Sequence, residues 1–150
     1  MNQSIASLVQ TLSDLLEKSS IKIALAESCT GGQLAAHLTA QAGSSLWFDR
    51  GFVTYSNASK TESIGVSPSI IEQYGAVSEE VAKAMAQGAL NHSAAKTSIA
   101  ITGIAGPGGA VPGKPVGTVC FGWAHGDIVH TERVVFSGDR AAVRAQTAEH

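Results

Sequence analysis

The chain is poor in charged residues, in aromatic residues and in cysteine. Charged residues make up 15% of its 150 residues and aromatic residues 5%, while hydrophobic residues reach 44%. This is the composition of a folded domain and argues against a disordered chain. The formal net charge of −2 provides no basic field, so non-specific nucleic-acid binding has no support and we expect no nucleic-acid partner. A small local phosphate site is compatible with these numbers.

The small number of cysteines and the lack of long hydrophobic runs exclude further classes of protein. Two cysteines, Cys29 and Cys120, do not make a disulfide framework, so we expect a reduced, cytoplasmic setting. No hydrophobic run approaches the length of a membrane-spanning helix, and the N-terminus lacks the pattern of a signal peptide, so we expect no membrane partner. No Cys, His or carboxylate cluster has metal-ligand spacing, which predicts no metal site. The length predicts one domain over residues 1–150.

Hydrophobic periodicity predicts helices that alternate with strands early in the chain, followed by a late hairpin. The expected helices cover 3–18, 31–41, a short segment with Asn57 as N-cap, 68–74, 79–91 and about 139 to 150. The expected strands cover 21–26, 51–55, 96–101, 116–124 and 128–136. Together they predict an α/β fold in which helices cover a mixed sheet.

The most informative stretch is 27–33, which lies between an expected strand and an expected helix. Its serine, Ser28, would sit beside the free N–H groups of a helix N-terminus, which can stabilise a phosphate or an oxyanion. The loops 27–32, 55–60 and 102–115 each follow an expected strand, so we expect them to meet at one edge of the sheet. The third loop is rich in glycine and proline, which indicates close approach of backbone to a ligand.

Ser28 is a candidate nucleophile, although most serines at such turns are simple N-caps. None of the five histidines lies in a glycine-rich loop, which disfavours a Ser-His-Asp triad. Lys60 is the alternative base, because a lysine desolvated in a cleft has a lowered pKa; a solvated helix lysine is the competing interpretation. Tyr55 would relay or orient the proton, or would be a core residue with its hydroxyl at the rim.

Three further features leave alternatives open. Cys29 is a second candidate nucleophile, because a helix N-terminus lowers the pKa of a thiol, but burial as a small apolar residue is commoner. The segment 103–109 has neither the ending of a P-loop nor the spacing of a dinucleotide fingerprint. Arg140 and Arg144 lie one turn apart on the last expected helix, where they would hold a phosphate or carboxylate, or would simply be solvated.

Four blocks of the sequence, in order, resemble the CinA C-terminal domain family, whose stand-alone members are nicotinamide-nucleotide amidases. The blocks are AESCTGG (26–32), GFVTYSN (51–57) with Lys60, GAVS (75–78), and TGIAGPGG (102–109) with KPVG (114–117). The resemblance runs from about residue 5 to the end of the chain, and members of the family usually extend beyond the position of His150.

The resemblance implies a three-layer α/β/α sandwich, a homo-oligomer, a small nucleotide substrate and no cofactor. It implies deamidation of nicotinamide mononucleotide, with Ser28 as nucleophile and Lys60 and Tyr55 as its activating partners. Two alternatives are a non-catalytic pyridine-nucleotide-binding module and a hydrolase of a different carboxamide. The residues expected to contact the substrate or its oxyanion are Glu27, Thr30, Gly31, Gly32, Asn57, Thr102, Gly103, Gly106, Arg140 and Arg144.

Overall fold

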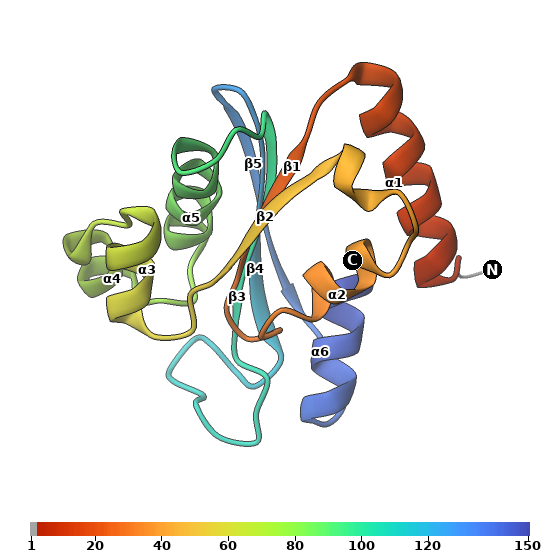
Figure 1. Ribbon diagram of the computed structural model, residues 1–150. Helices are drawn as coiled ribbons and strands as arrows, with labels where there is room; N and C mark the ends of the chain where they lie inside the picture. The colour runs from red at the N-terminus through yellow and green to blue at the C-terminus, as the bar shows by residue number, and fades with distance from the viewer. Residues whose placement is uncertain (1–2) are drawn as a thin grey trace.

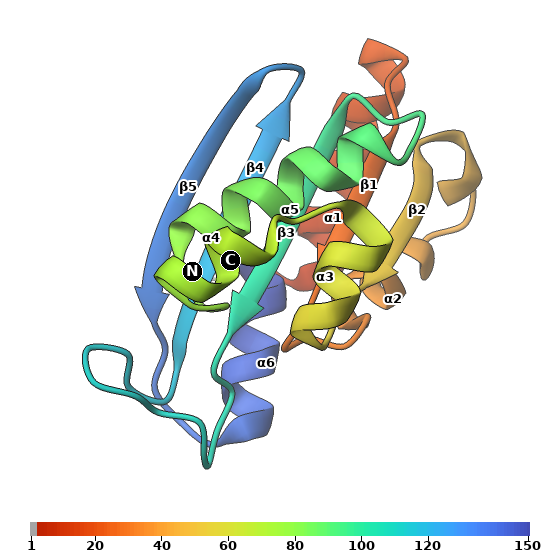
Figure 2. The same cartoon turned by 90° about the vertical axis from the view of Figure 1, so that its left-hand side faces the viewer.

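The protein is seen in a computed structural model that describes residues 3–150. The centre of this region is a five-stranded sheet with the order β2-β1-β3-β4-β5 (Figures 1 and 2). The strands are β1 Ile23–Glu27, β2 Phe48–Val53, β3 Thr97–Gly103, β4 Thr118–His125 and β5 Ile128–Val135. β1 pairs in parallel with β2 and β3, whereas β4 pairs antiparallel with β3 and β5. The predicted mixed sheet with a C-terminal hairpin is confirmed.

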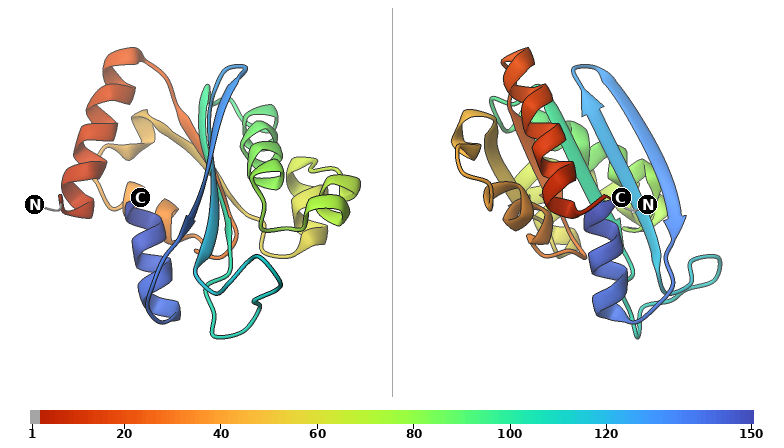
Figure 3. Two further views of the ribbon diagram at one scale, coloured as in Figure 1. Left: turned by 180° about the vertical axis from the view of Figure 1, so that it is seen from behind. Right: turned by 90° about the vertical axis from the view of Figure 1, so that its right-hand side faces the viewer.

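Helices cover both faces of the sheet and complete three layers (Figures 1 and 3). One face carries α1 Ile5–Ser19, α2 Gln33–Thr39 and α6 Arg140–Glu149; the other carries α3 Asn57–Ile64, α4 Pro68–Tyr74 and α5 Glu79–Asn91. A short 3-10 helix, η1 Ser44–Leu46, precedes β2. Each face has its own buried apolar cluster, as expected of a sheet covered on both sides. Within residues 3–150, no helix is long and apolar enough to cross a membrane.

The first strand, β1, is the element on which the functional end of the sheet is built. All five of its residues are buried, because helices cover both faces and strands flank both edges. Its apolar run is typical of parallel strands that are buried on both sides. The parallel strands β1, β2 and β3 end at the same edge of the sheet, so the segments that follow them gather there (Figure 2).

Several predicted boundaries were wrong by a few residues. β2 ends at Val53, so Tyr55 lies beyond the strand and not in it. The predicted N-cap Asn57 is the first residue of α3, and the cap is Ser56, whose Oγ accepts a hydrogen bond from the Ser59 N–H at 3.1 Å. The third strand continues to Gly103, because its pairing with β4 extends past residue 101 into the predicted loop. The second helix begins at residue 33 and not 31, and the fourth strand at 118 and not 116.

A close helix contact fixes the position of α3. A Cβ atom on Gly88 of α5 would lie 2.1 Å from the carbonyl oxygen of Ile64, which is the last residue of α3. Only a glycine lets the two backbones approach this closely. Since Lys60 lies one turn before Ile64, this contact also sets where the Lys60 side chain starts.

We expect Gly88→Ala to lower the free energy of unfolding by about 1–3 kcal/mol, because α3 must move to admit the methyl group. Urea unfolding followed by circular dichroism measures the change. Gln87→Ala, at the exposed neighbouring position on the same helix, is the control and should stay within about 0.5 kcal/mol of the parent chain. Equal stability of the two variants would contradict the importance of this contact.

Candidate active site

Ser28 stands at the carboxyl end of the central strand. Its backbone N–H donates to the Ile101 carbonyl of β3 at 3.0 Å, which holds the residue to the edge of the sheet. Its side chain is 7% exposed, and its Oγ lies 3.4 Å from the Tyr55 carbonyl oxygen and 3.3 Å from the Lys60 Nζ. The nucleophile and base suggested by the sequence are therefore neighbours in space, although 32 residues separate them in the chain.

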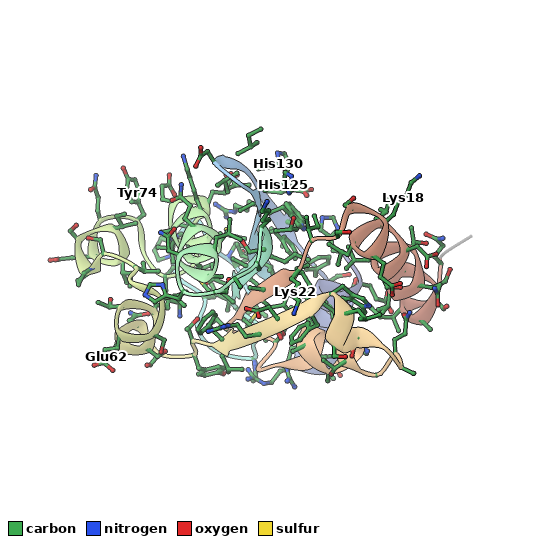
Figure 4. The ribbon with its side chains drawn as sticks, turned by 45° about the horizontal axis from the view of Figure 1, so that its top comes forward. Lys18, Lys22, Glu62, Tyr74, His125 and His130 are labelled. Atoms are coloured by element: carbon green, nitrogen blue, oxygen red, sulfur yellow. The ribbon has the colours of Figure 1, made fainter. Side chains whose placement is uncertain are left out.

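Lys60 is a buried amine without a counter-ion. Its side chain is 1% exposed, and no carboxylate of residues 3–150 lies within ion-pair distance of it. Its neighbour Glu62, on the same helix, points outward (Figure 4). Nζ donates to the carbonyl oxygens of Thr54 at 3.0 Å and Tyr55 at 3.3 Å. Burial lowers the pKa of Lys60 below its ordinary value of 10.5, since a charged amine is poorly solvated there.

The contacts of Nζ can be made by either form of the amine. A neutral amine has two N–H donors and one lone pair, whereas an ammonium has three donors and no acceptor. Nζ donates to the carbonyls of Thr54 and Tyr55 and to the hydroxyl oxygen of Ser28, and that hydroxyl donates in turn to the Tyr55 carbonyl. Rotation of the Ser28 hydroxyl toward the lone pair of a neutral Lys60 would give the arrangement that a general base requires.

Tyr55 contacts this pair through its backbone and not through its phenol. Its carbonyl oxygen accepts from both Ser28 and Lys60, while its exposed side chain carries a hydroxyl that accepts from Arg140 Nη2 at 3.1 Å. The Tyr55 hydroxyl is hydrogen-bonded to Arg140 and not to Ser28 or Lys60, so this structure does not support the direct proton relay that the sequence suggested.

A cavity of about 240 Å³ opens beside Ser28. It is lined by segments that follow β1, β2 and β3, so the predicted meeting of three loops is confirmed. The long connection from β3 to β4 extends beyond this end of the sheet, close to the start of α6 (Figure 2). The predicted residues that line the cavity are Ser28, Tyr55, Asn57, Lys60, Thr102, Gly103, Gly106 and Arg140.

One wall of the cavity was missed by sequence reasoning. Ala76 and Val77 line it from the turn between α4 and α5. The Thr102 hydroxyl donates to the Ala76 carbonyl at 2.8 Å, so this side chain ties the wall to β3. Small apolar residues in a turn carry no chemical signal of their own, although the block 75–78 did belong to the family resemblance.

Glu27 does not face the cavity, which corrects its assignment as a substrate contact. Its side chain is 1% exposed, and its carboxylate accepts from the backbone N–H groups of Leu34 and Ala35, each at 2.9 Å. These are N–H groups of the first turn of α2. The sequence predicts that these N–H groups are free to bind a substrate anion, but they already donate to the Glu27 carboxylate.

Three other predicted substrate contacts also lie outside the cavity beside Ser28. Thr30, Gly31 and Gly32 line a separate surface hollow with Arg144. The Gly31 N–H donates to the Ser28 carbonyl oxygen at 3.0 Å, so it is not available as an oxyanion donor. This contradicts the expectation that Gly31 stabilises the reacting group.

Cys29 is the weaker of the two candidate nucleophiles. It lines the cavity, but its thiol is buried, and burial raises the pKa of this thiol to about 11. A thiol with this pKa is almost entirely protonated at neutral pH, and the thiolate is the reactive form. A side chain on Gly103 would meet the Cys29 sulfur at 3.0 Å, which indicates a packing role for the thiol.

The two arginines of α6 reach the functional edge from the far end of the chain. Arg140 donates to the Gly106 carbonyl at 2.8 Å and to the Tyr55 hydroxyl, and it lines the cavity. Arg144 donates to the carbonyl oxygens of Cys29 and Thr30, both at 3.1 Å. Neither guanidinium has a carboxylate of residues 3–150 within ion-pair distance, so each keeps its charge without a counter-ion from these residues.

The rate at which a fluorophosphonate labels Ser28 should rise with pH and then level off. Lys60 accepts the serine proton only when it is neutral, and burial lowers its pKa, so we expect the midpoint below pH 10.5. Mass spectrometry of the labelled chain measures the rate. Lys60→Met is the control, and it should react slowly at every pH. An unchanged profile in this variant would show that Lys60 is not the base.

Comparisons with known proteins identify the family of this chain. The family model of the CinA C-terminal domain matches residues 5–150. A nicotinamide-nucleotide amidohydrolase, PncC, from Pseudomonas putida is 48% identical over 95% of this chain and 89% of its own length. PncC from Enterobacter agglomerans is 58% identical over 84% of this chain and 77% of its own.

A longer protein and a solved structure from the same family also match this chain. A CinA-like protein of Mycolicibacterium vanbaalenii is 56% identical over 83% of this chain, which covers 30% of that protein. The crystal structure of a competence-damaged protein (CinA) superfamily protein from Escherichia coli matches with a TM-score of 0.94 and 40% identity, covering 97% of this chain and 85% of that one. The chain belongs to the CinA C-terminal domain family.

Proposed function

We propose that this protein is an amidase that converts nicotinamide mononucleotide to nicotinate mononucleotide and ammonia, with Ser28 as nucleophile and Lys60 as its base. The observation that carries the proposal is the 3.3 Å contact between Ser28 Oγ and a buried Nζ that has no counter-ion. Two relatives at 48% and 58% identity, named nicotinamide-nucleotide amidohydrolases, support the substrate class.

In the proposed reaction, neutral Lys60 takes the proton of Ser28 while Oγ attacks the carboxamide carbon. The cationic pyridinium ring withdraws electrons and assists the attack. The tetrahedral intermediate collapses as Lys60 returns the proton to the nitrogen, which leaves as ammonia. Water then attacks the ester on Ser28, giving its proton to Lys60, and the carboxylate product leaves as Oγ regains a proton.

The oxyanion needs N–H donors that the protein does not use itself. Among residues 3–150, no backbone carbonyl accepts from the N–H groups of Cys29, Ala105 or Gly106, and all three residues line the cavity. Cys29 directly follows the nucleophile, which is a common position for one such donor in serine hydrolases. We assign the oxyanion to Cys29 together with the glycine-rich segment, where each donor is worth about 10²–10³ in turnover.

Arg140 is the better of the two candidates for the phosphate of the substrate. It is exposed at the cavity, and its contacts with Gly106 and Tyr55 use part of a guanidinium that has five N–H donors. Arg144 lines the other hollow and already donates to two carbonyls of the nucleophile turn.

The direct test is incubation of the protein with nicotinamide mononucleotide, followed by measurement of ammonia and nicotinate mononucleotide. We expect equal amounts of both products and a fall in kcat of at least about 10³-fold in Ser28→Ala. Ser63→Ala, at an exposed position of α3, is the matched control and should retain full activity. Binding without release of ammonia would favour a binding module, and release from other carboxamides alone would indicate a different amidase.

Arg140→Ala should raise KM for the mononucleotide by about 10–100-fold, because a charge-assisted hydrogen bond to the phosphate is lost. Hydrolysis of nicotinamide riboside, which lacks the phosphate, should change by less than about threefold. Arg144→Ala, in contrast, should lower kcat for both substrates, since it loosens the nucleophile turn. Steady-state kinetics with the two substrates separates these results, and an equal loss on both in Arg140→Ala would argue against the phosphate contact.

A further inference from the structure

Glu27 is a buried carboxylate whose charge is balanced by hydrogen bonds and not by a cation. It is the last residue of β1, and no lysine, arginine or histidine of residues 3–150 lies within ion-pair distance of it. Its Oε1 accepts from the Thr30 hydroxyl at 2.6 Å and from the Leu34 N–H, and its Oε2 accepts from the Ala35 N–H. Such short bonds to a carboxylate are stronger than hydrogen bonds between neutral groups.

These contacts make Glu27 the cap of a helix that has no cap of its own. The N-cap position of α2 is Gly32, which has no side chain and makes no capping hydrogen bond. Leu34 and Ala35 are the second and third residues of the helix, and their N–H groups are the ones that an N-cap side chain normally accepts from. The carboxylate comes instead from seven residues before Leu34, and the positive end of the helix dipole favours its charge.

The turn between β1 and α2, residues 28–32, is thus held from two sides. Glu27 binds the hydroxyl of Thr30 within the turn and the helix that follows it. From the other side, Arg144 of α6 binds the carbonyl oxygens of Cys29 and Thr30. α2 and α6 lie side by side on the same face of the sheet, which lets both contacts act on one turn (Figures 1 and 3).

We infer that Glu27 is a positioning residue for the nucleophile: its carboxylate fixes α2 and the turn 28–32 to the end of β1, so that Ser28 Oγ faces Lys60 Nζ. Glu27 touches neither the substrate nor the cavity. It acts through the turn, and it also fills the N-terminus of α2, so substrate anions bind elsewhere. The kinetic part of this inference rests on the proposed amidase function.

The test is Glu27→Gln, which keeps the shape of the side chain. The variant loses the charge and places an NH₂ group against the N–H groups of α2 or the Thr30 hydroxyl. We expect kcat for nicotinamide mononucleotide to fall about 10–100-fold, because small displacements of a nucleophile have effects of this size, while KM stays within about twofold. Rates are expressed per Ser28 that reacts with a fluorophosphonate, so that unfolded protein is not counted.

The matched control is Glu80→Gln. Glu80 is an exposed carboxylate in the first turn of α5 and is not part of the turn 28–32. Glu80→Gln should leave kcat, KM and the labelling of Ser28 unchanged. If Glu27→Gln does not fold, Thr30→Val removes one of the three donors and leaves the charge in place. That variant should show a smaller fall in kcat with the same unchanged KM.

Two readouts do not depend on the substrate. Amide exchange measured by nuclear magnetic resonance should speed up by at least about tenfold at Leu34 and Ala35 in Glu27→Gln, and labelling of Ser28 should slow. If the parent chain releases no ammonia, the proposed function fails, while these readouts still test the positioning role. Normal kcat with unchanged exchange would overturn the inference, and so would a rise in KM alone, which would place Glu27 on the substrate.

Discussion

The site depends on an amine that is buried without a counter-ion. Charging the Lys60 amine in this environment is unfavourable, so burial lowers its pKa and shifts the amine toward the neutral form, which is the form that can accept a proton. Nζ donates to the carbonyls of Thr54 and Tyr55 and to the hydroxyl oxygen of Ser28. These carbonyls are available because β2 ends at Val53, where the chain leaves the sheet. The end of a strand thus determines the orientation of the base.

The buried carboxylate of Glu27 has to be kept apart from this amine. A carboxylate next to Lys60 would favour the ammonium form, raise the pKa of the lysine and remove the base. Successive residues of a strand point to opposite faces of the sheet. Glu27 therefore points to the face of α2, while Ser28 meets α3 on the other face. One step along the chain separates a carboxylate that accepts from helix N–H groups from a hydroxyl that contacts the Lys60 amine.

Sequence patterns predicted the parts of the site that follow from topology. Because parallel strands end at one edge of the sheet, the meeting of the loops that carry Ser28 and Lys60 could be inferred from strands and loops alone, whereas the pairing of the two residues came from the family resemblance. The roles of Tyr55 and Glu27 could not be inferred in this way, since each depends on which atoms of the residue make the contact: the backbone carbonyl of Tyr55 and the side-chain carboxylate of Glu27. The predicted end of β2 was two residues too late, so the Tyr55 carbonyl was not expected to contact Ser28 and Lys60. A helix cap that comes from seven residues before Leu34 has no local sequence signature.

The remaining contacts of the site cross long stretches of the chain. Arg140 and Tyr55 are 85 residues apart, and Arg144 and Cys29 are 115 apart, yet both pairs are hydrogen-bonded. Such contacts form only when the ends of a long loop have been brought together, so no local fragment contains the nucleophile in its final geometry. α6 is therefore more than a cover for the sheet. It is the last element of the described chain to contribute to the site, and its two arginines make the geometry of Ser28 a property of the whole fold.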